Sequence, residues 1–172
     1  MLLTRYALAI IDSERACTRR YIQQLKDSMA AYAPNQVRER AERLLAFAET
    51  RQRVRFDNCL LPALRSATAL DDGASPAERG AVQEMEQLAQ LGSAMLPGLR
   101  DCLCNSGAAS LPAFLHAYCG NLALRLECEE NRLLPLACHL LSAEAWFHVG
   151  AAFLRHDEEA GVNNYAISAK LH

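Results

Sequence analysis

The chain has 172 residues, of which 51% are hydrophobic, and its formal net charge is only -2. This length suits a single domain covering residues 1–172, and it allows a substantial core without disulfides or metals. The weak net charge argues against the strongly basic surface that binding to nucleic acid or to an anionic membrane would require.

Membrane insertion and secretion are not expected either. No apolar run approaches the roughly 18 residues of a membrane span. The seven cysteines are an odd number spread through helical patterns, and no secretory signal precedes them. We therefore expect a cytoplasmic protein with reduced thiols.

The first half of the chain has the pattern of two long helices. Apolar residues recur at helical spacing from Leu8 to Met29, and Pro34 follows that stripe. A second stripe runs toward Pro62, where we expect the helix to end because proline lacks a backbone donor. A polar stretch over 66–75 is predicted to link the two halves.

The second half has the pattern of three helices. Ser75, Pro76 and Glu78 have the spacing of an N-cap, an N1 proline and a capping-box glutamate. Ser110 and Ser142 can cap the next two helices. No segment alternates with a period of two, so the predicted fold is all-α: an up-down antiparallel four-helix bundle with a short fifth C-terminal helix. The predicted helices are about 5–32, 36–62, 76–104, 111–138 and 143–155.

A short repeat supports this division into halves. Leu60-Leu61-Pro62-Ala63-Leu64 recurs as Leu133-Leu134-Pro135-Leu136-Ala137. Each copy closes a long helical pattern, so two copies predict two helical hairpins.

Two charged residues interrupt the apolar stripes. Arg15 lies on the inner face of the first helix and Glu129 on that of the fourth. A buried charge needs a partner, and Arg125 stands one turn before Glu129. We therefore expect a buried ionic cluster of Arg15, Arg125 and Glu129. The alternative is that the arginine stems lie along the edge of the core with their guanidinium groups in water.

Three segments carry a family resemblance. They are Ile11-x-x-Glu14-Arg15, then Phe56-Asp57-x-x-Leu60-Leu61-Pro62, then Glu129-Glu130-x-x-Leu133-Leu134-Pro135-Leu136-Ala137 followed by Leu141-Ser142 and Trp146. In the same order they resemble motifs of the hemerythrin-like, or HHE cation-binding, family. The resemblance implies an up-down four-helix bundle that holds two irons, or one, between inward histidines and carboxylates for oxygen binding, sensing or repair of iron centres.

When the ligand positions of the family are carried over to this chain, one of them keeps a ligand residue, Glu129. The other ligand positions of the family correspond to residues that do not fit iron: Arg15, Gln52, Phe56, Met85 and Arg125. Iron in such a site needs imidazole nitrogens and several carboxylates, and a guanidinium repels a cation. We therefore expect a degenerate site, with no metal and no other cofactor.

One alternative keeps a metal. A shift of one residue in the second helix exchanges Gln52 and Phe56 for Arg53 and Asp57, so any metal would use Glu129 and Asp57. With one of the five histidines, these carboxylates would form an unconventional iron site for metal binding, or for oxygen or redox sensing.

The sequence thus leads to three hypotheses. The favoured one is a non-catalytic binding or regulatory module, whose partner is a protein or a small anion at Arg15, Arg125 and Glu129. The second is the iron-based sensor. The third is a purely structural bundle that pairs with another helix or with itself as a homo-oligomer. We expect no enzyme, because no nucleophile has a recognisable base and no glycine-rich phosphate loop occurs.

Overall fold

The computed structural model describes residues 2–70, 75–105 and 109–159. These residues form helices and short connections, and no strand occurs among them. The predicted all-α class is therefore confirmed for the described part of the chain.

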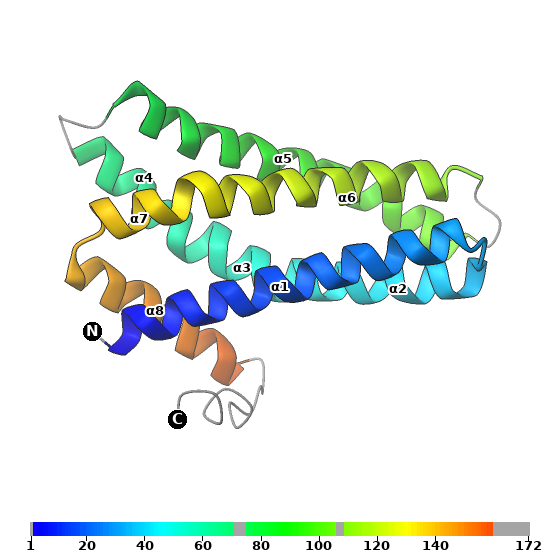
Figure 1. Ribbon diagram of the computed structural model, residues 1–172, viewed down its shortest axis with the longest axis horizontal. Coiled ribbons are helices and arrows are strands. Elements are labelled where there is room, and N and C mark those ends of the chain that lie inside the picture. The colour runs from blue at the N-terminus through cyan, green and yellow to red at the C-terminus, as the bar shows by residue number, and fades with distance from the viewer. Residues whose placement is uncertain (1, 71–74, 106–108, 160–172) are drawn as a thin grey trace.

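The described residues form five continuous helical stretches (Figure 1). The second stretch contains two π-helical segments and the fourth contains one, and in these segments the backbone makes a wider turn. In chain order the elements are α1 (Leu2–Ala30); α2 (Pro34–Phe47), η1 (Ala48–Gln52), α3 (Arg53–Arg55), η2 (Phe56–Leu60) and α4 (Leu61–Leu70); α5 (Pro76–Cys104); α6 (Leu111–Cys128), η3 (Glu129–Leu133) and α7 (Leu134–Leu140); and α8 (Ala143–Glu159).

The caps of two helices follow the sequence signals. The Ser75 hydroxyl accepts a hydrogen bond from the Glu78 N–H at 3.2 Å, and the Glu78 carboxylate accepts one from the Ser75 N–H at 2.6 Å. The Ser142 hydroxyl accepts from the Ala145 N–H at 3.1 Å. Ser110 occupies the N-cap position of α6, but its side chain makes no capping hydrogen bond.

The predicted end of the second helix near Pro62 is wrong, because the helix continues to Leu70. The Leu61 N–H donates to the Phe56 carbonyl five residues back, so a wide turn precedes the proline. Leu134 donates to the Glu129 carbonyl in the same way, just before Pro135. A wide turn relieves the clash of a proline ring with the preceding turn.

The repeat therefore marks a π turn inside a continuing helix, and residues 66–70 of the predicted linker are helical. The other predicted boundaries lie within four residues of the observed ones, and 76–104 agrees with α5. Residues 71–74 of the predicted linker, and the part of the predicted domain at 160–172, lie outside the described residues.

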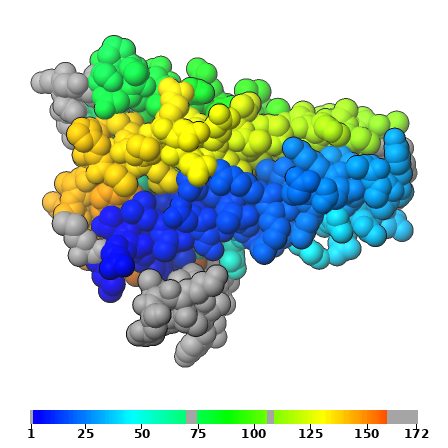
Figure 2. Space-filling view, in the orientation of Figure 1, coloured from blue at the N-terminus to red at the C-terminus, as the bar shows by residue number. Residues whose placement is uncertain are grey.

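The four long helical stretches run along the long axis of the molecule, and the shorter α8 lies obliquely at one end (Figure 1). α1 packs against α2 and α8, α5 against α6, and α4 against both α5 and α7. Figure 1 shows the chain reversing between α1 and α2, between α4 and α5, and between α5 and α6. Figure 2 shows α1 beside α6 and η3 on the same face.

Among the described residues, the core consists of two apolar clusters. The first includes Phe56, Leu60, Leu133, Trp146 and Phe153, and α8 contributes to it. The second includes Leu25, Leu44, Leu99, Leu115 and Tyr118. On three of the long helices, the residues between the two clusters are polar or charged, and these residues form the candidate site.

Candidate functional site

We use the name polar layer for the side chains that separate the two apolar clusters. α1 contributes three of them between Ile11 and Ile22, and the other members come from the second and fourth helical stretches. All are buried except Asp57, which is half-buried. The polar layer consists of Glu14, Arg15, Thr18, Gln52, Arg55, Asp57, Arg125 and Glu129.

Glu129 lies at the centre of this layer with no exposed surface. Gln52 is its hydrogen-bond donor, with Nε2 3.4 and 3.5 Å from the two carboxylate oxygens. The Thr18 hydroxyl lies 2.8 Å from Gln52 Oε1 and 2.9 Å from the Glu14 carbonyl. Burial raises the pKa of Glu129 to about 7, against the opposing attraction of Arg125 and the Gln52 hydrogen bond.

Arg15 and Arg125 lie in the same layer as Glu129, but their ion pairs go to other acids. Arg125 Nη2 is 2.7 Å from Asp57 Oδ1. Arg15 Nη2 is 2.7 Å from Asp12 Oδ1 and 3.8 Å from Glu130 Oε1, both on the surface side. The expected direct pairing of these arginines with Glu129 is therefore absent from the ion pairs of the described residues.

The position of Arg15 agrees in part with each of two predictions, a buried ionic cluster and an arginine stem along the edge of the core. Its side chain is only 10% exposed, as a core position requires, yet its guanidinium reaches outward to surface carboxylates. Its Nε and Nη1 atoms are buried without a protein hydrogen-bond partner. Such atoms are costly unless a water molecule bonds them.

A second buried network was not predicted from the sequence. Arg55 forms ion pairs with Glu14 of α1 and with Asp157 of α8. The Tyr6 hydroxyl donates to Asp157 Oδ2 at 2.7 Å, and the Arg55 guanidinium lies 5.7 Å from the centre of the Phe153 ring. Burial raises the pKa of Glu14 to about 7, although Arg55 opposes this shift. The network joins α1, α3 and α8.

The sequence pattern indicates burial for one member of this network, Glu14. Glu14 follows Ile11 by three residues and precedes Thr18 by four, so it belongs to the buried stripe of α1 as much as Arg15 does. Asp157 gave no comparable signal, because the predicted last helix ended at residue 155. Arg55 stands beside Phe56 in the sequence, and in the structure both are buried and line the cavity of the polar layer.

A small cavity lies inside the polar layer. Its volume is about 10 Å³, and its walls include Glu14, Arg15, Gln52, Arg55 and Glu129. A space of this size holds one water molecule. Phosphate or a carboxylate ligand needs more room, so nothing in this geometry supports a small anion among Arg15, Arg125 and Glu129.

The donors around this cavity do not fit iron. The guanidinium groups of Arg15 and Arg55 line it, and two of the ligand positions of the family, Phe56 and Met85, carry apolar side chains buried in the first cluster. Among the described residues, no group of three or more histidine, cysteine, aspartate or glutamate side chains could hold a metal ion. Asp57, proposed with Glu129 as an alternative ligand, is engaged by Arg125 and by Arg53 Nε at 3.4 Å.

The histidines do not complete such a site. Of the four histidines among the described residues, His116, His139 and His148 are exposed and His156 is half-buried on α8, whereas Glu129 is fully buried. None of the four belongs to a group of side chains that could hold a metal ion, so an iron site at Glu129 would need other donors.

Comparison with known proteins identifies no relative. No family model matches the chain, and neither a curated protein nor a solved structure does so. Within the described residues, no helix has the length and apolar character to cross a membrane.

Proposed function

We propose that this chain is a single hemerythrin-like domain, an up-down four-helix bundle with α8 as a fifth helix, that works without iron. In this proposal it is a cytoplasmic, non-catalytic binding or regulatory module. The observation that carries it is the hydrogen bond between Gln52 and Glu129, which links two ligand positions of the family in the centre of the core.

The packing supports the bundle part of the proposal. The four long helical stretches lie side by side, and neighbours in sequence pack as pairs, α1 with α2 and α5 with α6 (Figure 1). The two copies of the repeat each follow a π turn, at Phe56 and at Glu129. Such turns are frequent at functional sites of helical proteins, so their coincidence with ligand positions of the family supports a shared origin of the site.

The chemistry of the layer supports the metal-free part. A di-iron site concentrates negative and imidazole ligands around a cation. Here Arg15, Arg55 and Arg125 bring three positive charges into the same layer. Two of its acids, Glu14 and Asp57, form ion pairs with Arg55 and Arg125. The arginines thus replace the charge of the metal, and a protein-only network replaces coordination.

Elemental analysis of the purified protein after aerobic loading with iron tests this proposal. We expect less than about 0.1 iron per chain and no oxo-bridged absorption, because the layer lacks imidazole ligands. One or two irons per chain would contradict it and support the sensor. In that case Glu129→Ala should lose the iron, while Glu130→Ala, its exposed neighbour, should keep it.

The purely structural bundle is the second candidate. It is favoured by the small size of the cavity in the polar layer, which leaves no room for a ligand there. Sedimentation of the purified protein measures its oligomeric state. A homo-oligomer that binds no ligand would support this candidate.

A further inference from the structure

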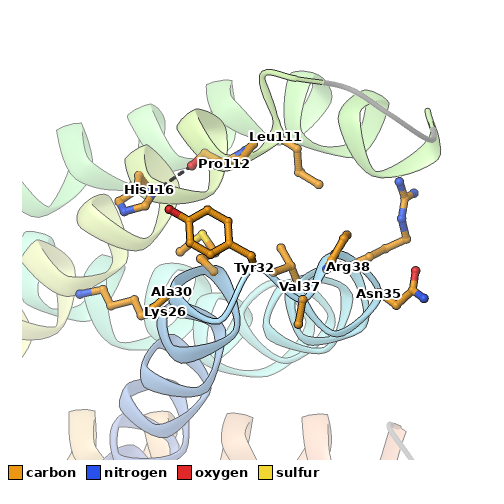
Figure 3. Close-up of a pocket in the computed structure, with 12 residues that line it drawn as sticks. Lys26, Ala30, Tyr32, Asn35, Val37, Arg38, Leu111, Pro112 and His116 are labelled. Atoms are coloured by element: carbon orange, nitrogen blue, oxygen red, sulfur yellow. Dashed lines mark hydrogen bonds between the residues drawn. The ribbon is translucent and has the colours of Figure 1, made fainter.

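A much larger pocket lies far from the polar layer, where α1 turns into α2 and α6 begins (Figure 3). Its volume is about 920 Å³, which is within the range of small-molecule sites. The apolar part of its wall includes Met29, Val37 and Leu111. We call it the end pocket.

The end pocket is lined by two cationic side chains, together with the polar side chains of Tyr32, Asn35 and His116. Lys26 and Arg38 line it, and among its described lining residues there is no aspartate or glutamate. Neither cation has an ion pair within the described part of the chain, and Arg38 makes one long hydrogen bond, 3.5 Å to the Asn105 carbonyl. Figure 3 shows the two side chains on opposite sides of the pocket. A ligand with one negative group and an apolar body would complement this surface.

Tyr32 at the pocket has an unusual backbone conformation. The Tyr32 N–H donates to the Met29 carbonyl and the Ala33 N–H to the Ser28 carbonyl, the bonding pattern of a Schellman helix end. The residue in the left-handed position of this motif is usually glycine, yet here it is tyrosine with φ 50. A strained residue persists only where the surroundings or a function require it.

The side chain of Tyr32 gives no structural reason for the strain. It is 92% exposed, so it adds little to the core. In Figure 3 its ring stands between the corner of α1 and α2 and the first turn of α6, with Lys26 on one side and Arg38 on the other. The strained turn thus holds an aromatic ring at the pocket, where an apolar ligand could pack against it.

We infer that the end pocket binds a medium-chain fatty carboxylate. The chain lies against Met29, Val37 and Leu111 beside the Tyr32 ring, and the carboxylate is held by Arg38, whose planar fork matches two carboxylate oxygens. Lys26 adds attraction for the negative charge. This inference rests on the proposed binding function and gives that function a site, but it needs nothing from the polar layer.

Calorimetric titration with decanoate, below its micelle concentration, tests the inference. Decanoate should bind saturably, and Arg38→Met should weaken it about tenfold by removing the charged fork while keeping a long side chain. Lys26→Met should weaken it less. The matched control is Arg43→Met, which removes a second arginine of α2. Arg43 is paired with Glu39 outside the pocket, so its removal should leave affinity unchanged.

A second variant separates binding from stability. Tyr32→Gly removes the ring and suits the left-handed position, so the variant should melt no lower than the parent protein while its affinity for decanoate falls. Parental affinity in Tyr32→Gly would overturn the role of the ring.

Three results would overturn the inference itself. One is the absence of saturable binding, including the case in which the protein is a dimer with the pocket covered. Another is equal affinity for decanoate and the uncharged decanol. The third is an equal effect of Arg38→Met and Arg43→Met. None of these results depends on iron content, so failure here is distinguishable from failure of the metal-free proposal.

Discussion

Glu129 has only weak hydrogen bonds for a carboxylate with no exposed surface. The two contacts from Gln52 are 3.4 and 3.5 Å long. The nearby arginines form their ion pairs with Asp57, Asp12 and Glu130 instead. A buried carboxylate without a close cation favours its uncharged form. The role of Glu129 is therefore that of a buried polar group whose charge depends on pH.

Stability should fall as the pH rises through neutrality. The pKa of Glu129 is raised from 4.5 in the unfolded chain to about 7 in the fold, so the folded protein binds the proton more tightly. This contribution is fully present below about pH 4.5 and is lost as the pH rises through about 7. Glu129→Gln removes this contribution. Between about pH 4 and pH 8, the free energy of unfolding of the variant should therefore fall by about 3 kcal/mol less than that of the parent protein. Urea denaturation at both pH values measures the difference.

The neighbour Glu130 provides the control. Its hydrogen bond from Arg19 lowers its pKa, so its contribution has the opposite sign and is lost as the pH falls. Glu14 and Asp57, whose pKa values burial also raises, remain in the Glu129→Gln protein and keep part of the pH dependence. If that protein were less stable than the parent at about pH 8, a direct charge pair between arginine and Glu129 would be the better description.

Arg55 should matter more to stability than any arginine at the surface. Its side chain is 5% exposed and lies between the buried carboxylates of Glu14 and Asp157. Arg55→Met leaves both without their cation, and we expect it to lower the free energy of unfolding by about 3 to 5 kcal/mol. Arg132→Met, which breaks an exposed pair with Glu84, should cost less than about 1 kcal/mol. Urea denaturation compares the two variants.

A charge-removal series checks the cause of this loss. Adding Glu14→Gln and Asp157→Asn to Arg55→Met removes the stranded charges and should recover part of the stability. No recovery would mean that the loss comes from packing of the arginine against Phe153 instead.

Some residues of the layer could be predicted from the sequence, but their partners could not. The apolar stripes placed Arg15 and Glu129 in the core, and both are buried. The choice of Asp57 for Arg125 depends on how two helices lie against each other, and no periodicity within one helix contains that information. The same holds for Arg55 and Asp157, which are 102 residues apart in the chain.

At the scale of elements, the helices were predictable and their internal geometry was not. Strong local signals such as the Ser75 capping box fixed the start of α5. The rule that proline ends a helix failed at Pro62, because a π turn accommodates the ring within a continuing helix. Such a turn changes which residues of the helix face the core. The ligand positions of the family were therefore hardest to assign on the second helix.

The contact between α5 and α6 depends on a glycine. A Cβ at Gly92 would lie 2.7 Å from Asn121 Oδ1, and Asn121 Nδ2 donates to the Leu88 carbonyl at 3.0 Å. Gly92→Ala should therefore lower the free energy of unfolding by about 1 kcal/mol or more, despite the helix propensity of alanine, because Asn121 must move. Thermal and urea denaturation measure this.

Gly80 is the matched control on the same helix. Nothing lies within 4 Å of a Cβ built there, so Gly80→Ala should raise the free energy of unfolding by up to about 1 kcal/mol. Equal stabilisation by both substitutions would show that Asn121 yields without cost and that α5 and α6 do not need the glycine.

At the scale of the whole molecule, the long helices connect the two apolar clusters. α1 contributes Ile10 and Ile11 to the first cluster and Ile22 and Leu25 to the second, with the polar layer between them. The second and fourth helical stretches also pass through both clusters. The same helices thus contribute residues to both clusters. Because a helix propagates cooperatively, unfolding of one cluster destabilises the helices that form the other cluster.

This arrangement predicts that both clusters unfold together, as expected of one domain. Leu44 is buried in the second cluster, whereas Trp146, the one tryptophan of the chain, is buried in the first. Leu44→Ala should cost about 2 to 5 kcal/mol and should shift the urea midpoint equally by far-ultraviolet circular dichroism and by Trp146 fluorescence. A fluorescence midpoint that stayed in place while the dichroism midpoint fell would mean that the polar layer separates two folding units. In that case Arg55 and Glu129 would mark the boundary between them.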